Sequence, residues 1–233
     1  MTSAVILAGG LGVRLRSAVP DLPKPMAPIN GRPFLEYLMS YWIGQGVTKF
    51  VLLVGYKREL IMSHFGRKYM EIPIEYIEEE TPLGTGGGLL LAAKKLTHPF
   101  ILLNGDTYFG VQLKNLMEFH VLKGSKFTFS LFQSNETGRY GGVELESNNR
   151  IRSLNTEKSN VGDLANGGVY LVDPGIFNSI EFIIGQKYSL EDDVIPALLG
   201  GRADLFGVEI NGPFLDIGLP RDYYQAADIL ARI

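Results

Sequence analysis

The sequence lacks cysteine, and its 233 residues include only one tryptophan and three histidines. The absence of cysteine excludes disulfides, thiolate nucleophiles and thiolate metal sites, and it is consistent with a cytoplasmic protein. The three histidines, His64, His98 and His120, are spread along the chain, so they do not predict a zinc site. Any metal ion is therefore expected to be held by oxygen ligands.

Long apolar runs and basic clusters are also missing. No stretch reaches the ~20 apolar residues that a membrane-spanning helix needs, so no membrane partner is expected. Basic and acidic residues number 22 and 25, which gives a net charge of −3, and no lysine and arginine cluster offers a surface for nucleic acid. The opening MTSAVILAGG has no basic lead or cleavage site, and it predicts a first strand rather than a signal peptide.

The first half of the chain alternates short apolar runs with segments of helical periodicity. The apolar runs, typical of strands buried on both faces, are Ala4–Ala8, Phe50–Val54, Phe100–Leu103 and, later, Val169–Val172. The helical segments are Phe34–Gln45, Arg58–Phe65, Leu89–Leu96 and Lys114–Leu122. This alternation predicts an α/β fold: a Rossmann-like, doubly wound, mixed but mostly parallel sheet flanked by helices.

The pattern changes after about Ser125. Phe127–Gln133, Gly142–Glu146 and Ile151–Asn155 alternate as antiparallel strands do, and Pro220–Ile233 predicts a closing helix. No linker, repeat or low-complexity tract interrupts the chain. We expect one domain over residues 1–233, with a nucleotide-binding half at 1–124 and a second half at 125–233.

The loop after the first strand carries the first functional motif, Leu7-Ala8-Gly9-Gly10-Leu11-Gly12-Val13-Arg14-Leu15. Glycines at this edge of an α/β sheet let backbone N–H groups approach phosphate oxygens. No Gly-Lys-Ser/Thr follows, and Leu15 stands where a dinucleotide fingerprint needs a third glycine. Arg14 instead offers a fork of donors, and Lys24 is fixed between Pro23 and Pro25, so a triphosphate is the expected ligand.

This motif with Pro23-Lys24-Pro25 resembles the signature of the sugar-phosphate nucleotidyltransferases, also called sugar-nucleotide pyrophosphorylases. The family joins a nucleoside triphosphate to a sugar 1-phosphate and releases pyrophosphate. The resemblance runs over the whole chain. It implies that the second half binds the sugar, that Arg14 neutralises the leaving pyrophosphate and that Lys24 lies near the α-phosphate.

A second motif, Glu79-Glu80-Thr81-Pro82-Leu83-Gly84-Thr85, corresponds to the family's base pocket. A carboxylate just before the Pro-x-Gly stretch can accept from guanine N1–H and the exocyclic amine together. By register from Gly84 the resemblance gives this role to Glu79, with Glu80 as the alternative. It implies GTP as the nucleotide. The implied nucleotide-binding residues are Leu7, Ala8, Gly9, Gly10, Gly12, Arg14, Lys24, Glu79, Glu80, Pro82, Gly84, Thr85, Asn104, Gly105 and Asp106.

Asn104-Gly105-Asp106 ends a buried strand at the same sheet edge as the glycine loop. The resemblance makes Asp106 a Mg²⁺ ligand, with Asp216 of Phe214-Leu215-Asp216-Ile217-Gly218 as its partner. Two carboxylates completed by substrate phosphates and water make a typical magnesium site. The implied catalytic residues are Arg14, Lys24, Asp106 and Asp216.

The sugar phosphate is assigned to the second half. The resemblance places Glu157 on sugar hydroxyls and Lys158 on the 1-phosphate, and it implies a sugar-side set of Tyr140, Gly141, Glu157, Lys158, Asn166, Gly167 and Asp216. One departure stands out. The family usually has an acidic residue after the proline of its closing segment, whereas Pro220 is followed by Arg221, to which no role is assigned.

Length and motifs are most similar to the guanylyltransferase branch acting on heptose or mannose 1-phosphate, which implies GDP-heptose for bacterial surface polysaccharide. A uridylyl-, cytidylyl- or thymidylyltransferase on another sugar is the alternative within the family. A non-catalytic nucleotide-sugar-binding regulatory module is the alternative of another class, and a nicotinamide oxidoreductase is disfavoured by the missing glycine. The sugar and the oligomeric state, including a homo-oligomer, are left open.

Overall fold

The structure, a computed structural model, describes residues 2–231, with the side chains of residues 155–158 left out. Its central parallel strands come from the first half, in the order β6-β4-β1-β7. Their bounds are Ser3–Leu7 for β1, Lys49–Val54 for β4, Ile72–Glu78 for β6 and Phe100–Asn104 for β7. The three strands predicted in this half are confirmed to within one residue at either end.

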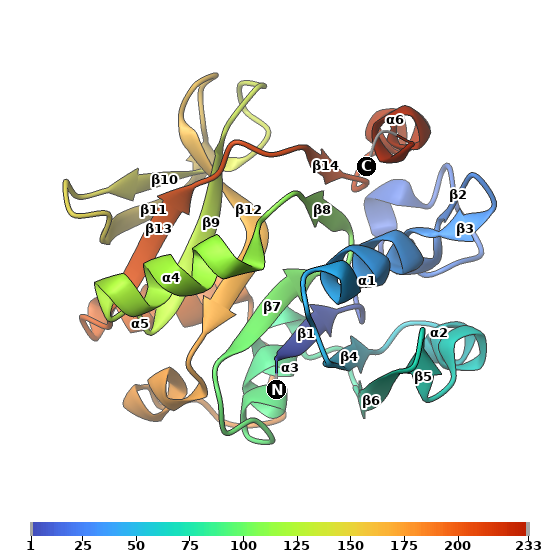
Figure 1. Ribbon diagram of the computed structural model, residues 1–233, viewed down its shortest axis with the longest axis horizontal. Coiled ribbons are helices and arrows are strands. Elements are labelled where there is room, and N and C mark those ends of the chain that lie inside the picture. The colour runs from blue at the N-terminus through green and yellow to red at the C-terminus, as the bar shows by residue number, and fades with distance from the viewer. Residues whose placement is uncertain (1, 232–233) are drawn as a thin grey trace.

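The second half extends the same sheet with antiparallel pairings, which lie at the left of Figure 1. The strand β12 (Leu164–Val172) runs antiparallel to β7 and also pairs with β9 (Phe127–Gln133) and β10 (Gly141–Leu145). The remaining strands are β11 (Ile151–Lys158), β13 (Leu205–Glu209) and, on the far edge, β5 (Lys68–Tyr69). The described residues thus form one ten-stranded mixed sheet, as the α/β prediction requires.

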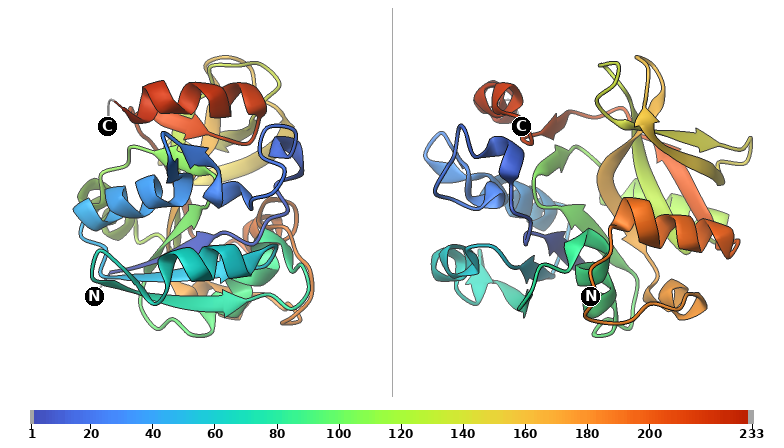
Figure 2. Two further views of the ribbon diagram at one scale, coloured as in Figure 1. Left: turned by 90° about the vertical axis from the view of Figure 1, so that its right-hand side faces the viewer. Right: turned by 180° about the vertical axis from the view of Figure 1, so that it is seen from behind.

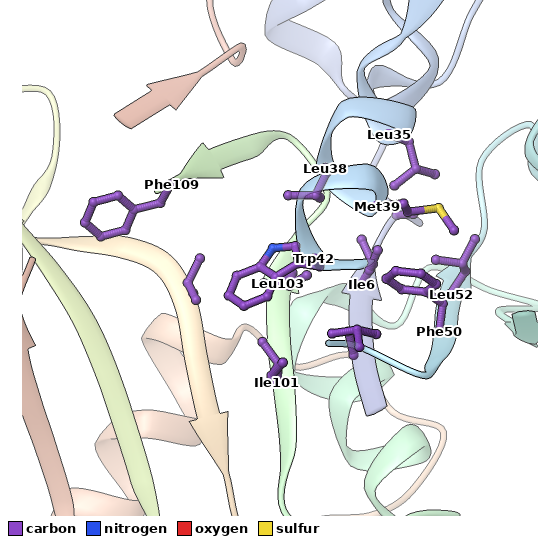
Figure 3. Packing of buried hydrophobic residues seen from close by; sticks show 14 of the residues in the cluster. Ile6, Leu35, Leu38, Met39, Trp42, Phe50, Leu52, Ile101, Leu103 and Phe109 are labelled. Atoms are coloured by element: carbon purple, nitrogen blue, oxygen red, sulfur yellow. The ribbon is translucent and has the colours of Figure 1, made fainter. Parts of the chain in front are cut away.

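Helices cover both faces of this sheet because its strands are apolar on both sides. In β1, Ala4 and Ile6 pack into one buried cluster and Val5 into the other. The first cluster is covered by α1 (Phe34–Gly44), α2 (Arg58–Phe65) and α4 (Leu113–Lys123), and the second by α3 (Gly84–Ala93) and α5 (Ile195–Gly200). Figure 3 shows Trp42 of α1 among the side chains of the first cluster.

A smaller layer closes the molecule beside the glycine loop. The pair β8 (Thr107–Phe109) and β14 (Phe214–Asp216) leads into α6 (Pro220–Leu230), and a short hairpin is formed by β2 (Pro28–Ile29) and β3 (Arg32–Pro33). Ala226 and Leu230 of α6 pack in a third cluster with Leu15 and Phe34. Figure 2 shows α6 on this side of the molecule. The predicted closing helix is confirmed through Leu230, and residues 232–233 lie outside the described range.

A strap from the second half, residues 186–189, lies against the start of α3. A Cβ on Gly87 would come within 2.5 Å of the Gln186 carbonyl oxygen, and one on Gly84 within 2.5 Å of the Tyr188 carbonyl oxygen. The N–H of Gly86 donates to that same Tyr188 oxygen at 2.9 Å. The glycines therefore permit a close approach of two segments about one hundred residues apart. Among the described residues, no helix has the length and apolarity needed to cross a membrane.

Candidate functional site

The loops that follow β1, β4 and β7 meet at the carboxyl ends of these parallel strands. Leu7, the last residue of β1, is in register with Leu53 of β4 and with Asn104 of β7. The N–H of Gly105 donates to the Leu7 carbonyl at 3.1 Å, and a Cβ at Gly105 would lie only 2.5 Å from that oxygen. Glycine at 105 therefore lets the loop after β7 cross directly over β1. This edge of an open α/β sheet is where such folds bind ligands.

A cavity of about 420 Å³ opens at this edge. Its volume is within the range of small-molecule sites. The predicted nucleotide-binding residues that line it are Leu7, Gly9, Gly10, Gly12, Arg14, Lys24, Glu79, Pro82, Gly84, Thr85, Asn104, Gly105 and Asp106. The sequence motifs from residues 7–24, 79–85 and 104–106 are thus brought to one place.

Two residues predicted for the nucleotide, Ala8 and Glu80, do not line the cavity. Ala8 is completely buried directly after β1, and its N–H donates to the Leu53 carbonyl at 2.9 Å. Glu80 is exposed, whereas its neighbour Glu79 is half-buried at the cavity. The structure therefore favours Glu79 over Glu80 as the acidic group that faces a ligand.

Several lining residues were not among the predicted site residues: Leu11, Val13, Pro25, Leu53, Lys187 and Gly218. Four of them adjoin predicted positions or belong to a predicted strand, so inspecting those segments more closely would have found them. Lys187 comes from the strap, and Gly218 lies two residues beyond Asp216. No local signal marks Lys187, because only the path of residues 186–189 across α3 brings it to the cavity.

The Glu79 carboxylate is built closely into its surroundings. A Cβ on Gly88 would lie 2.9 Å from Glu79 Oε1. Cβ atoms on Gly9 and Gly55 would each lie 3.3 Å from the same carboxylate, so the three glycines make room for it. Glu79 Oε2 accepts one hydrogen bond, from the Leu83 N–H at 3.2 Å. Burial raises the pKa of Glu79, and that single hydrogen bond opposes the rise. Its carboxylate pairs with no described lysine or arginine, so it retains acceptor capacity for a ligand.

Lys24 lies between the two predicted metal ligands. Its ammonium donates to Asp106 Oδ2 and lies 3.7 Å from Asp216 Oδ1. Asp216 Oδ1 also accepts from the Gly218 N–H at 2.6 Å. Burial and the nearby Asp106 carboxylate raise the pKa of Asp216, while Lys24 opposes the shift. Asp106 and Asp216, distant in sequence, therefore meet at one cation.

The donor set can be compared with what a magnesium ion needs. In the described part of the chain, no cluster of three or more His, Cys, Asp or Glu side chains could hold a metal ion by itself. Mg²⁺ usually takes one or two carboxylates, with phosphates and water as the other ligands. The position between Asp106 and Asp216 already accommodates the ammonium of Lys24, so two carboxylates that share a cation are in place. The residues fit a metal that substrate phosphates complete.

The glycine loop leaves backbone donors for an anion in the cavity. Within residues 2–231, the backbone N–H groups of Gly10, Leu11 and Gly12 have no protein acceptor. Arg14 follows them in a 3₁₀ turn, Val13–Leu15, with its side chain exposed at the cavity. Backbone amides beside an exposed guanidinium suit an anion with several oxygens.

The predicted sugar-side residues form a separate group. Tyr140 packs against Phe214 with ring centroids 5.6 Å apart, and burial raises its pKa to about 12. Asn166 donates to the Tyr170 hydroxyl at 2.6 Å and accepts from the Gly168 N–H. None of the described members of the set, Tyr140, Gly141, Asn166, Gly167 and Asp216, lines the cavity, although Asp216 contacts Lys24, which does. The side chains of Glu157 and Lys158 lie outside the described residues, so their roles stay predictions.

Comparisons with known proteins agree on one family. A family model described as "Nucleotidyl transferase" matches residues 3–232. The chain is 40% identical over 224 residues to D-glycero-alpha-D-manno-heptose 1-phosphate guanylyltransferase of Campylobacter jejuni, covering 95% of this chain and 97% of that protein. Identity to the protein of the same name from Aneurinibacillus thermoaerophilus is 38%, covering 96% of each. The crystal structure of HddC from Yersinia pseudotuberculosis is similar, with a TM-score of 0.87, 33% identity, and coverage of 98% of this chain and 99% of that one.

Proposed function

This chain belongs to the nucleotidyl transferase family, and from that membership we propose that it joins GTP to D-glycero-α-D-manno-heptose 1-phosphate. The products are GDP-heptose and pyrophosphate. Near-complete coverage of two heptose 1-phosphate guanylyltransferases supports the sugar, and HddC, a structural relative, has been solved in complex with GMP-PN. The observation that carries the chemistry is the cation-bridged pair Asp106 and Asp216 beside the glycine-loop cavity.

The reaction needs charge neutralisation more than proton transfer. A phosphate oxygen of the sugar 1-phosphate, already anionic, attacks the α-phosphorus of GTP. The new oxygen–phosphorus bond forms as the bond to the β-phosphate oxygen breaks, and the electron pair leaves with pyrophosphate. Two anions must meet and a third must leave, so positioned cations lower the barrier.

We assign the cations by their places in the cavity. Arg14 and the N–H groups of residues 10–12 receive the β- and γ-phosphates. Lys24, which lies beside Asp106 and Asp216, is assigned to the α-phosphate. Lys158 and Glu157 are proposed for the 1-phosphate and the sugar hydroxyls. Mg²⁺ would be held by Asp106 and Asp216 in place of the Lys24 ammonium and would supply positive charge to the reacting phosphates.

Guanine selectivity is assigned to Glu79. Its free acceptor capacity suits the N1–H and exocyclic amine of guanine, which lie side by side on one edge of the base. Neither uracil nor thymine presents that pair of donors, and cytosine lacks a ring N–H there. We propose further that the enzyme acts in the cytoplasm and that its product serves bacterial surface polysaccharide.

A matrix of the common nucleoside triphosphates against sugar 1-phosphates, scored by pyrophosphate released with Mg²⁺, tests the proposal. GTP with the heptose 1-phosphate is expected to give the highest kcat/KM, and mannose 1-phosphate is the informative second sugar. A preference for a pyrimidine nucleotide would reject the role of Glu79. Nucleotide binding without pyrophosphate from any pair would identify a binding module instead.

Arg14→Ala provides a check within this experiment. Losing one such electrostatic donor costs on the order of 10²–10³ in rate. The exposed side chain of Arg14 makes no ion pair with another described residue, so the melting temperature should not change. Normal turnover in this variant would remove Arg14 from the pyrophosphate site.

A further inference from the structure

Four charged side chains form a closed ring where the connection between β9 and β10 meets the start of α6. Arg139 donates to both carboxylate oxygens of Asp222, at 3.0 and 2.6 Å, and to Glu136 at 3.2 Å. Arg221 pairs with that same Glu136 oxygen, and its Nε lies 3.5 Å from Asp222 Oδ1. Positive and negative groups therefore alternate around the ring, which we call the clasp.

The inner half of the clasp is well shielded from solvent. The side chains of Arg139 and Asp222 are 11% and 14% exposed, while those of Glu136 and Arg221 are 39% and 54% exposed. Burial alone would lower the pKa of Arg139, but hydrogen bonds to Asp222 and Glu136 raise it. A charged, two-pronged arginine–carboxylate pair fixes both distance and orientation. Arg139 is therefore held in one position.

From that position Arg139 contacts both sides of the reaction centre. Its Nη2 lies 3.8 Å from Asp216 Oδ2, the oxygen of Asp216 that does not face Lys24. Its guanidinium also lies 4.8 Å from the ring centroid of Tyr140, in the turn assigned to the sugar. One side chain thus touches the proposed metal ligand and the proposed sugar-side turn.

These two parts belong to different sheets, and besides Arg139 they are joined by the packing of Tyr140 on Phe214 of β14. Asp216 belongs to the two-stranded sheet of β8 and β14, whereas Tyr140 precedes β10 of the ten-stranded sheet. Building on the proposed function, we propose that Arg139 is a positioning residue: the clasp holds it so that Asp216 and the sugar-side turn keep a fixed separation. That separation determines how the sugar phosphate approaches the α-phosphate.

The clasp also gives Arg221 a role. An acidic residue at 221 would add a fourth carboxylate to the three that already surround the Arg139 guanidinium. Arg221 instead supplies a second cation for Glu136 and Asp222, and the hydrogen bond from Arg221 lowers the pKa of Glu136. Glu136 and Arg221 therefore act as a matched pair in this chain.

Arg139→Lys tests the proposal, because lysine keeps the charge but cannot bind both oxygens of Asp222 in the same geometry. We expect kcat to fall on the order of 10²-fold, the cost of misplacing reacting groups by about 1 Å. The KM for GTP should change little, and the KM for the sugar 1-phosphate should rise. Arg150→Lys is the matched control, since Arg150 donates to two backbone carbonyls and pairs with Asp204 at 3.3 Å, outside the cavity lining.

A second measurement does not depend on turnover. Mn²⁺ binding in the presence of a non-hydrolysable GTP analogue, followed by electron paramagnetic resonance, should weaken in Arg139→Lys and remain unchanged in Arg150→Lys. If Arg139→Lys loses only melting temperature and retains kcat and Mn²⁺ affinity, the residue is structural and the proposal fails. Should the substrate matrix give no turnover, Mn²⁺ binding alone decides the positioning role, so the two failures are distinct.

A double-mutant cycle tests whether the clasp acts as a unit. Glu136→Gln and Arg221→Gln should each lower kcat, and the double variant should lower it no further than the more severe single variant. If the kcat losses of the two single variants multiply in the double variant, the two residues do not act through the same contact. That outcome would overturn the role given to Arg221.

Discussion

The two sides of the proposed reaction centre use charge in different ways. On the nucleotide side, Arg14, Glu79 and Lys187 line the cavity and form no ion pair with another described residue. On the sugar side, Arg139 and Asp222 bind each other with two hydrogen bonds. Free charges provide binding groups for a ligand, whereas paired charges hold the protein in shape. We infer that the nucleotide side is built for recognition and the sugar side for alignment.

Lys24 lies where the two sides meet. It contacts Asp106, which follows β7 in the first half of the chain, and Asp216, which ends β14 in the second half. Both aspartates contact the same ammonium, and Asp216 also contacts Arg139, so Asp216 connects the two sides. The strongest test of the comparison therefore falls on Asp216.

Asp216→Asn should have the largest effect, a loss of kcat on the order of 10²–10³ or more. The amide keeps the size of the side chain and can still accept from Gly218, but it removes the negative charge. Asp173→Asn is a matched control, because Asp173 accepts from Gly175 at 2.9 Å and pairs with Lys126 without lining the cavity. Near-normal turnover of purified Asp216→Asn would reject the metal assignment.

Glu79→Gln should change which base is preferred. A two-pronged contact to a base contributes about 1–3 kcal/mol of discrimination, which is a factor of roughly 5 to 160. The wild type should prefer GTP to ITP, which lacks the exocyclic amine, and the variant should lose most of that preference by weakening GTP. Glu80→Gln, at the exposed neighbouring position, should leave the ratio of kcat/KM values intact. If Glu80→Gln abolishes the preference instead, the alternative assignment is right.

The raised pKa of Glu79 predicts a pH dependence on the nucleotide side. As pH falls through that raised value, the carboxylate gains a proton before ordinary glutamates do, so GTP affinity should begin to fall early. Stability should change in the opposite sense: between the ordinary and the raised pKa, the folded state binds more protons than the unfolded state, so stability falls as pH rises. Titrations of GTP binding and of urea unfolding, each against Glu79→Gln, measure both effects. Parallel curves for the two proteins would disprove the assignment.

Lys187→Met should have the smallest effect. Its exposed ammonium at the cavity edge is expected to contribute about 0.2–1 kcal/mol, which is less than roughly 6-fold in GTP affinity. The effect should shrink as salt is added, because exposed charges are screened. Lys126→Met, beyond the cavity, should show neither the loss nor its salt dependence. A loss that persists at high salt would indicate a direct, shielded contact with the nucleotide.

Much of the fold could be predicted because its signals are local. The apolar periodicity of α1 and α2 gave their bounds to within one residue, since each helix buries one face. The start of α3 at Gly84, five residues before the predicted Leu89, was missed. Glycine disfavours helix, and here its presence is explained by contact with residues 186–189, which no local pattern reveals.

The candidate site, too, was only partly predictable from the sequence. Residues at the ends of parallel strands, such as Glu79 and Asp106, could be expected at one edge because the topology brings strand ends together. The contact between Arg139 and Asp222 joins residues 83 positions apart through side chains alone, so the sequence offered no sign of it. Sequence reasoning therefore found groups that follow strand ends or lie in motifs, including the paired Lys24, Asp106 and Asp216. It missed Arg139 and Lys187, whose places depend on contacts between distant segments.

Trp42, the sole tryptophan, is completely buried in α1, and its indole nitrogen has no hydrogen-bond partner in the part of the chain the structure describes. An indole in such apolar surroundings emits at short wavelength, and exposure to water shifts its emission to the red. Since no other tryptophan contributes, the fluorescence of the unlabelled enzyme reports on the packing between α1 and the parallel strands. Melting of the nucleotide half can thus be followed optically in every variant, without a dye or an added reporter.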